Sequence, residues 1–259
     1  MITIKTPQKI EILRAGGKIL ASALEKVRQA TVPGVSLSEL NKIAQDYLVA
    51  NGGRPSFLGY GGHKNKPGFP TALCASVNDE LVHGSGARDV VLKEGDIIGL
   101  DLGVQYPAKD GLYTDMAITV GVGQISKQAH DLINITRESL YLAIEQVKPG
   151  NYIHDISKTI QQFCEKAGYS VIRDLSGHGV GYAVHEDPSI PDYYDSRMPK
   201  ILLKEGMVIC IEPMVAVGGW RVKQDADGWT IRMADGGLAA HFEHTIVVVE
   251  GGYEILTEL

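Results

Sequence analysis

Residues 33–52 read PGVSLSELNKIAQDYLVANG, and residues 149–168 read PGNYIHDISKTIQQFCEKAG. Each stretch begins with a Pro-Gly turn, continues with apolar residues at helical spacing and ends at a glycine. Aligning the two prolines also aligns Leu37 with Ile153, Leu40 with Ile156, Tyr47 with Phe163 and Gly52 with Gly168. Several of these pairs are common turn residues, so chance similarity is the competing explanation. The self-similarity predicts one domain over residues 1–259, built from two related halves at about 5–122 and 123–259.

A further helix is predicted before each of these stretches. Apolar residues recur at helical spacing from Pro7 to Gln29, directly after the N-cap candidate Thr6, and again over residues 127–147. Within the repeated stretches, a capping-box pattern at the first position predicts a helix over 36–51. The corresponding helix of the second stretch is expected over residues 154–167, so the chain should contain two helix pairs.

Short strand-like segments, separated by glycine-rich turns, follow each helix pair. In the first half they are residues 71–77, 97–104 and 116–122, and in the second half residues 180–184, 207–211, 229–232 and 245–249. Strands that cluster after helices predict an α+β fold, with helices on one face of a curved antiparallel sheet. The sequence has neither a dinucleotide-binding fingerprint that opens a helix nor a phosphate-binding P-loop.

Composition excludes several classes of protein. The 259 residues are 44% hydrophobic and 22% charged, which is ordinary for a globular chain, and the formal net charge is −6. An acidic chain of this kind does not predict binding to nucleic acid or to a membrane. Three widely spaced cysteines indicate neither a disulfide framework nor a zinc ribbon. Because no signal-peptide segment and no apolar run of about 20 residues is found, we expect a cytoplasmic protein.

Five side chains with metal-binding chemistry lie mostly in or beside apolar, strand-like segments. They are Asp101, Asp115, His178, Glu212 and Glu243. Buried carboxylates are rare unless they are paired or bind a metal. Four carboxylates and one imidazole suit two divalent cations about 3.5–4 Å apart, because carboxylates can bridge the ions. Such a pair of ions activates water, so the set predicts a hydrolase.

The two aspartates lie on either side of a predicted hairpin turn. On paired strands, Asp101 and Asp115 can face each other. Asp110 is a rival for Asp115, but its position within Lys109-Asp110-Gly111 favours an exposed turn.

The other candidates also have ordinary structural explanations. His178 lies between two glycines, as residues of a turn often do, and Glu212 precedes a proline at an expected strand end. A second histidine, His185, follows at an odd spacing that would point it to the opposite face of a regular strand. A turn or bulge between the two histidines is therefore required if both face one pocket.

Four segments of the sequence resemble methionine aminopeptidases. They are NDELVHG at 78–84, LSGHGVG at 175–181, CIEPM at 210–214 and HFEHTIVV at 241–248. Single motifs of this set occur more widely, in Xaa-Pro aminopeptidases and prolidases. The resemblance implies the pseudo-twofold pita-bread fold, in which two helix pairs lie on the outer face of a curved antiparallel sheet. The short connection between His178 and Glu212 is similar to that of the type I enzymes.

The resemblance assigns roles by position. The positions that match the family's metal ligands are Asp101, Asp115, His178, Glu212 and Glu243. Among them Glu212 also resembles the general base, and Glu243 resembles the glutamate that bridges two metals. The positions that match the histidines contacting the substrate and stabilising the tetrahedral intermediate are His83 and His185.

The resemblance also places a methionine pocket. The positions where the family builds it are Tyr60, Phe69, Cys74 and Trp229. Ordinary core packing is the competing explanation for each of these four. Asn78 falls near a loop that binds a monovalent cation in the family.

Three features depart from the family pattern. Residues 61–68, between the pocket positions Tyr60 and Phe69, resemble an insertion at the pocket rim. The connection between the two aspartates is longer than is usual. His241 stands where family members often carry glutamine, two residues before Glu243, so it is a candidate to face or tune the site.

The function implied by the resemblance is removal of the initiator methionine from nascent chains when the second residue is small. Oxygen and nitrogen ligands are compatible with manganese, iron, cobalt or zinc. A proline-directed peptidase and a non-catalytic binding protein on the same fold are the alternatives, and the presence of all five ligands argues against the latter. The expected partner is the N-terminal methionine of peptides and nascent chains, a contact with the ribosome stays open, and we expect a monomer.

Overall fold

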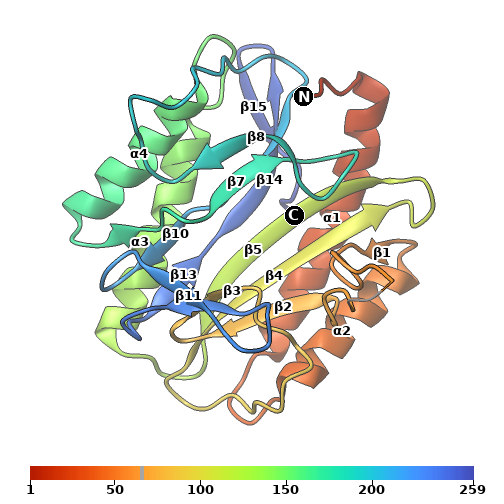
Figure 1. The fold of residues 1–259 in the computed structure, drawn as a ribbon. Helices are drawn as coiled ribbons and strands as arrows, with labels where there is room; N and C mark the ends of the chain where they lie inside the picture. Colours follow the sequence, from red (N-terminus) through yellow and green to blue (C-terminus); the bar gives the residue numbers. More distant parts are fainter. Residues whose placement is uncertain (65–66) are drawn as a thin grey trace.

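The computed structural model describes residues 1–64 and 67–259 (Figure 1). Its helices are α1 (Pro7–Ala30), α2 (Leu37–Ala50), α3 (Lys127–Ile144) and α4 (Ile153–Lys166), which confirms the predicted helices to within a few residues. The capping box before α2 is complete, because Glu39 N donates to Ser36 Oγ at 3.3 Å and Ser36 N donates to Glu39 Oε2 at 2.9 Å. Pro7 occupies the first turn of α1, where it leaves no hydrogen bond unmade.

One large sheet of nine strands forms the centre of the described structure. Its main path runs β1 (Arg54–Pro55), β4 (Ile97–Tyr106), β5 (Leu112–Gly121), β14 (Glu243–Val249), β9 (Val208–Ile211), β7 (Ser176–Gly179) and β8 (Glu186–Pro191). Two further strands pair at the side, β2 (Leu73–Val77) with β4 and β15 (Gly252–Ile255) with β14. All these pairings are antiparallel.

Two small antiparallel sheets accompany the large one. The first consists of β13 (Ala239–His241), β10 (Met214–Ala216) and β6 (Ser170–Val171). The second consists of β11 (Val222–Gln224), β12 (Ile231–Met233) and β3 (Glu80–Val82). The chain therefore has the predicted α+β pita-bread architecture, with a curved antiparallel sheet at its centre.

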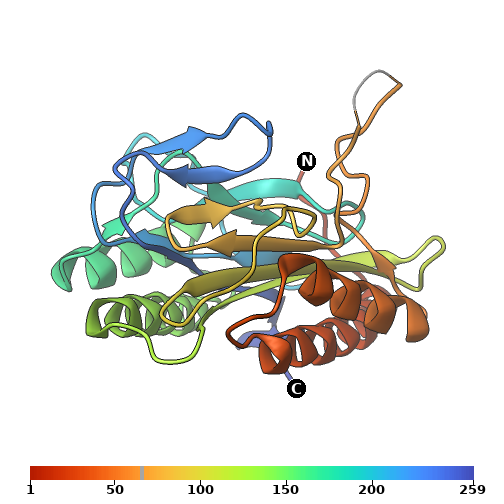
Figure 2. The same cartoon turned by 90° about the horizontal axis from the view of Figure 1, so that it is seen from below.

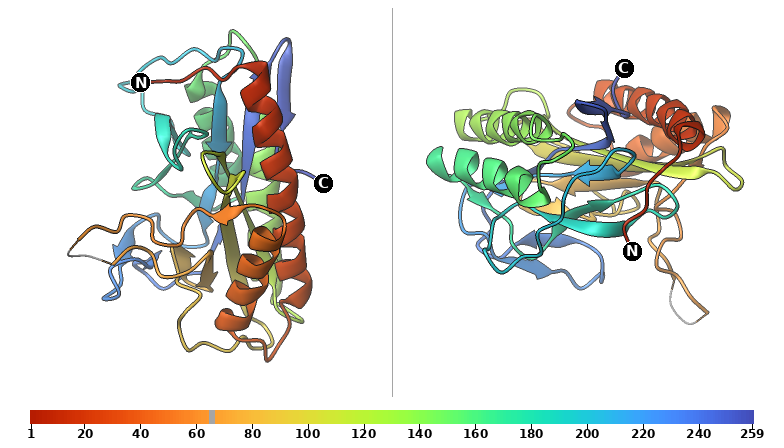
Figure 3. Two further views of the ribbon diagram at one scale, coloured as in Figure 1. Left: turned by 90° about the vertical axis from the view of Figure 1, so that its right-hand side faces the viewer. Right: turned by 90° about the horizontal axis from the view of Figure 1, so that it is seen from above.

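The helices and the small sheet of β11, β12 and β3 lie on opposite sides of the large sheet (Figures 2 and 3). The other small sheet, of β13, β10 and β6, packs against α3 and α4. On the helical side, α1 and α2 bury one apolar cluster against β2 and β4, including Leu20, Leu40 and Leu100. The pair α3 and α4 buries a second cluster against β9 and β14, including Ile160 and Ile246. Each helix pair thus anchors its own part of the sheet, and the opposite face is left to loops and hairpins.

One predicted strand is wrong. Residues 180–185 form a loop between β7 and β8 rather than a strand over 180–184. Gly181 has a φ of 137°, which is incompatible with a regular strand. The loop supplies the turn between His178 and His185 that the odd spacing required. The other predicted strand segments are found as β2, β4, β5, β9, β12 and β14, with shifted ends.

The predicted insertion at 61–68 lies partly outside the described residues, which omit 65–66. The chain on either side of these two residues extends from the face opposite α1 and α2 (Figure 3). None of the helices in the described ranges is long and apolar enough to cross a membrane.

Candidate active site

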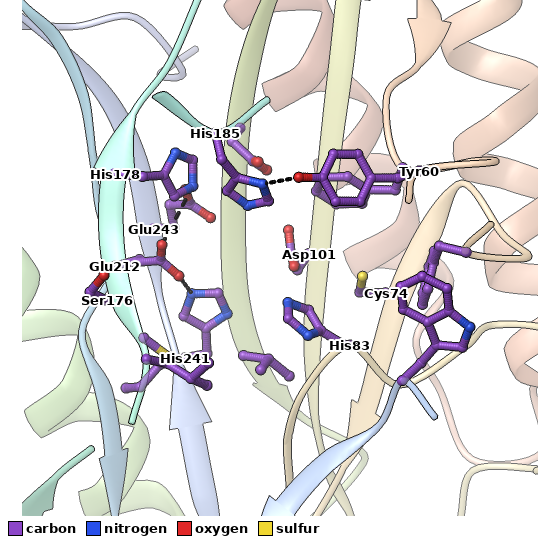
Figure 4. Close-up of a pocket in the computed structure, with 17 residues that line it drawn as sticks. Tyr60, Cys74, His83, Asp101, Ser176, His178, His185, Glu212, His241 and Glu243 are labelled. Carbon is purple, nitrogen blue, oxygen red and sulfur yellow. Dashed lines mark hydrogen bonds and ion pairs between the residues drawn. The ribbon is translucent and has the colours of Figure 1, made fainter. Parts of the chain in front are cut away.

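A cavity of about 180 Å³ opens on the face of the sheet opposite the helices (Figure 4). The predicted site residues that line it are Tyr60, Phe69, Cys74, His83, Asp101, Asp115, His178, His185, Glu212, Trp229 and Glu243. They come from segments as far apart in the sequence as the loop before β2 and the start of β14. The structure therefore brings every predicted ligand, histidine and pocket residue to one place.

The β4–β5 hairpin positions the two aspartates. In its register Gly103 faces Asp115 and Asp101 faces Ala117, so the two aspartates are diagonal neighbours on one face of the sheet. The main chain of Asp115 is held by Thr245 of β14, whose Oγ1 accepts from Asp115 N at 2.9 Å and donates to Asp115 O at 2.8 Å. The rival Asp110 is exposed in the hairpin turn with a φ of 56°.

His178 is oriented by its own strand. Its Nδ1 lies 2.9 Å from Gly179 O, so the ring donates its Nδ1 proton there and leaves Nε2 free. Nε2 lies 3.5 Å from Glu212 Oε1 and 3.9 Å from Glu243 Oε1. Glycine is required after the histidine because a Cβ on Gly179 would lie 2.1 Å from the carbonyl oxygen of Asp187 on β8.

The four carboxylates gather negative charge in a buried place. Burial raises the pKa of Asp101 to about 6. Burial and repulsion from neighbouring carboxylates raise the pKa values of Asp115, Glu212 and Glu243 well above the usual range. Burial lowers the pKa of His178 to about 3, so its imidazole is neutral. Among the described residues, no lysine or arginine forms an ion pair with any of the four.

These donor atoms fit divalent cations. Potential ligand atoms cluster in three groups of three residues, and within each group the atoms lie within 4.8 Å of one another. The groups are Asp101–Asp115–Glu243, Glu212–His241–Glu243 and His178–Cys210–Glu243. Glu243 belongs to all three groups, as a carboxylate shared between two ions would. Its Oε1 is buried without a hydrogen-bond partner, and so is Asp101 Oδ1. Buried oxygens without donors, beside mutually repelling carboxylates, are explained by positive ions at this position.

His83 and His185 lie outside the three ligand groups and face the same cavity. His83 adopts a left-handed conformation with a φ of 59°, and burial lowers its pKa to about 4. His185 lies at the mouth of the cavity, with its ring centroid 4.4 Å from that of His178. Tyr60 Oη lies 2.6 Å from His185 Nδ1, so the hydroxyl orients this imidazole. Both histidines can therefore contact a molecule in the cavity without binding the ions.

One end of the cavity is apolar. Phe69, Cys74 and two further buried residues, Phe57 and Val184, form a cluster with Trp229 packed against it. The rings of Phe69 and Trp229 meet edge to face, with centroids 5.5 Å apart. Cys74 on β2 lies opposite Asp101 in the sheet register, so the apolar end adjoins the carboxylates directly.

Several lining residues were not predicted as part of the site. They are Phe57, Val82, Leu175, Ser176 and Met214. All five stand within or next to motifs or pocket positions that the sequence already indicated. Four of them are apolar and equally typical of a core, and Ser176 is a polar residue beside the glycine before His178. His241, a candidate to tune the site, is buried with its Nε2 3.2 Å from Glu212 Oε2, and burial lowers the pKa of its imidazole.

Comparison with known proteins gives one consistent answer. The chain is 44% identical over its full length to methionine aminopeptidase 1 of Bacillus subtilis, which it also covers completely. The solved methionine aminopeptidase of Thermotoga maritima superimposes with a TM-score of 0.93 at 43% identity, and each chain covers all of the other. A prolidase from Pyrococcus furiosus, 23% identical, shares the fold with a TM-score of 0.77 over 99% of this chain and 65% of its own. Residues 11–250 match the model of metallopeptidase family M24, and the chain belongs to this family.

Proposed function

We propose that this chain is a metal-dependent aminopeptidase that hydrolyses the bond after an N-terminal methionine. The observation that carries the proposal is the junction of two unlike surfaces in one cavity. Four carboxylates and an imidazole converge at one end, and an apolar cluster of Phe69, Cys74 and Trp229 forms the other. Full-length relatives named methionine aminopeptidase support the same activity.

The ions would be two divalent cations of manganese, iron, cobalt or zinc. We propose that Asp101, Asp115, His178, Glu212 and Glu243 hold them, with Glu243 shared between the two. When bound, such ions polarise a carbonyl group and lower the pKa of water towards neutrality. Asp110 has no part in this set, because its side chain lies in the exposed hairpin turn.

The chain's own residues supply the proton transfers. Glu212 accepts the proton of the attacking water, as a carboxylate beside the scissile bond can. We assign the donor role in the Tyr60–His185 hydrogen bond to the Tyr60 hydroxyl, so that Nε2 of His185 carries the proton and donates to the oxygen on which negative charge develops. His83 is neutral because of its burial, and we assign it a second contact to the substrate.

The apolar end selects the side chain of the first residue. A methionine side chain is unbranched and polarizable, so it suits a narrow pocket lined by aromatic rings and a thiol. Each methylene contributes about 1–3 kcal/mol to such discrimination, so longer or branched side chains are disfavoured but not strictly rejected. The substrates we propose have a small second residue, such as alanine, glycine or serine.

The remaining assignments follow from this activity. We propose one catalytic domain of two related halves, acting on peptides and nascent chains in the cytoplasm. A monovalent cation near Asn78 stays a prediction. The carboxamide of Asn78 is hydrogen-bonded to Asp96 at 2.9 Å and to Ile97 N at 3.0 Å, so such a cation would rely on main-chain oxygens.

Parallel assays of metal-loaded protein on Met-Ala-Ser and on an Ala-Pro peptide test the proposal. We expect methionine to be released from the first peptide and the second to remain intact. The Glu212→Gln variant should lose several orders of magnitude in turnover, since it lacks both a charged ligand and the proton acceptor. Cleavage of Ala-Pro without methionine release would favour a proline-directed peptidase, and no cleavage of either would favour a binding protein.

A further inference from the structure

A buried ion pair between Lys5 and Glu186 lies next to His185 in the sequence, because Glu186 is the following residue. Lys5, in the segment that precedes α1, places its Nζ 2.8 Å from Oε2 of Glu186, and the two side chains are only 1% and 9% exposed. Glu186 is the first residue of β8 and the sequence neighbour of His185. The pair therefore connects the first residues of the chain to the strand that follows the histidine, although 181 positions separate them.

The carboxylate of Glu186 also binds the loop that carries His185. Its Oε1 accepts from the main-chain N of Tyr182 and, at 3.1 Å, from that of Ala183. Its Oε2 accepts from Thr3 Oγ1 at 2.6 Å in addition to Lys5. One carboxylate thus joins residues 182–183, in the middle of the loop, to the segment before α1.

Lys5 is itself held on two sides. Its main-chain N donates to Gly206 O at 2.8 Å, and its stem packs on Gly181, where a Cβ would lie 2.5 Å from Lys5 Cε. Gly181 in turn accepts from Tyr113 N at 2.8 Å, so the same loop is tied to β5 close to Asp115. The lysine therefore fills the space behind the loop as well as neutralising Glu186.

We propose that Lys5 and Glu186 are positioning residues that hold the imidazole of His185 against Tyr60 and His178. This proposal rests on the proposed function, because it assigns the pair to turnover through His185. A buried ion pair is weak evidence of stabilisation, since desolvation offsets the attraction of the charges. The hydrogen bonds of Lys5 and Glu186 to the loop at 180–185 and to the segment before α1 instead hold this loop in one conformation. Displacement of a reacting group by about 1 Å can cost on the order of 100-fold in rate.

The test is a double-mutant cycle in metal-loaded protein, measured as kcat and KM on Met-Ala-Ser. Lys5→Met removes the charge and keeps most of the stem, and it is made both alone and together with His185→Ala. Arg14→Met is the matched control. Arg14 pairs with Glu254 through Nε–Oε1 at 2.5 Å, which ties α1 to β15 without touching the loop at 180–185.

We expect Lys5→Met to lower kcat by about tenfold or more, with KM and metal content nearly unchanged. In the His185→Ala background the same substitution should change kcat by less than about twofold, because its effect acts through the missing imidazole. Lys5→Arg should recover part of the loss. Arg14→Met should leave kcat near that of the wild type in both backgrounds.

Equal losses from Lys5→Met in both backgrounds would overturn the proposal, as would an unchanged kcat in the single variant. If Lys5→Met does not fold, the double variant Lys5→Met/Glu186→Gln replaces it, because removing both charges leaves no unpaired buried charge. This variant is measured with and without His185→Ala, and the expected results are the same. Wild-type protein that releases no methionine would instead overturn the proposed function, so the two failures are distinguishable.

Discussion

Tyr60 Oη lies 2.6 Å from Nδ1 of His185, and the two rings meet edge to face with centroids 5.3 Å apart. Both residues line the cavity. Tyr60 lies in the segment before β2, and His185 lies in the loop between β7 and β8. A residue expected to contact methionine therefore also orients the imidazole of a histidine on the other side of the cavity.

Tyr60→Phe keeps the ring and removes this hydrogen bond. Because one such bond contributes about 0.5–1.5 kcal/mol, we expect kcat to fall about two- to tenfold while KM for a methionine peptide changes little. Tyr113→Phe is the control, since Tyr113 packs on the same apolar cluster but its hydroxyl contacts Arg54 at 3.3 Å. Equal losses in the two variants would show that the hydroxyl of Tyr60 has no special role.

The two aspartates of the hairpin can be told apart by metal analysis. Asp115→Asn should remove bound metal and activity, because a buried carboxylate ligand becomes a neutral amide. Asp110→Asn, in the exposed turn, should change stability by less than about 0.5 kcal/mol and keep the metal. Metal depletion in Asp110→Asn with a fully loaded Asp115→Asn would mean that the ligand has been assigned to the wrong side of the turn.

His83 should affect turnover but not metal content. We expect His83→Ala to lower kcat about 10²–10³-fold, the usual contribution of a general acid–base or oxyanion contact, with two ions still bound. His63→Ala, an exposed histidine in the segment before residue 65, should have no effect. Loss of one ion from His83→Ala would make His83 a ligand and would contradict the proposed ligand set.

The stability of the metal-free protein should depend on pH in an unusual direction. Burial raises the pKa of Asp101 from its ordinary value of 3.8 to about 6. A raised folded-state pKa means that the folded chain binds more protons, so stability is fully present below the unfolded value and is lost as pH rises. Bound cations replace those protons, so the metal-loaded protein should not share this loss.

Thermal unfolding between pH 4 and pH 8 measures the effect, with the metal-loaded protein as the reference. The difference in Tm between metal-loaded and metal-free protein should widen as pH rises through about 6. A constant difference over this range would show that the carboxylates stay ionised without cations.

Much of the fold could be predicted because its signals are local. The capping box at Ser36 and Glu39 fixed the start of α2, and apolar periodicity located the other helices. Asp101 and Glu212 each end an apolar run, and Glu243 lies just before one, but each of them alone also fits an ordinary strand or turn. The information about the site therefore came from the order and spacing of the five candidates together with the family resemblance.

The remaining features depend on contacts between distant segments. The loop at 180–185 has the composition of a strand, and only the packing of Gly181 on Lys5 shows why it is not one. Phe57 and Met214 look like core residues in sequence, because an apolar side chain facing a cavity does not differ from one facing a core. The approach of His241 to Glu212 likewise requires the pairing of β13 with β10.

In the large sheet, β14 lies between β5 and β9, and it brings Glu243 to the donor groups. Every other strand of that sheet except β15 precedes it in the sequence. During its own synthesis the chain can form the β4–β5 hairpin and the β7–β9 strands early, but these remain two separate pieces. The proposed shared ligand and the strand that joins the pieces arrive together, so we expect each new molecule to stay inactive until its sheet is closed.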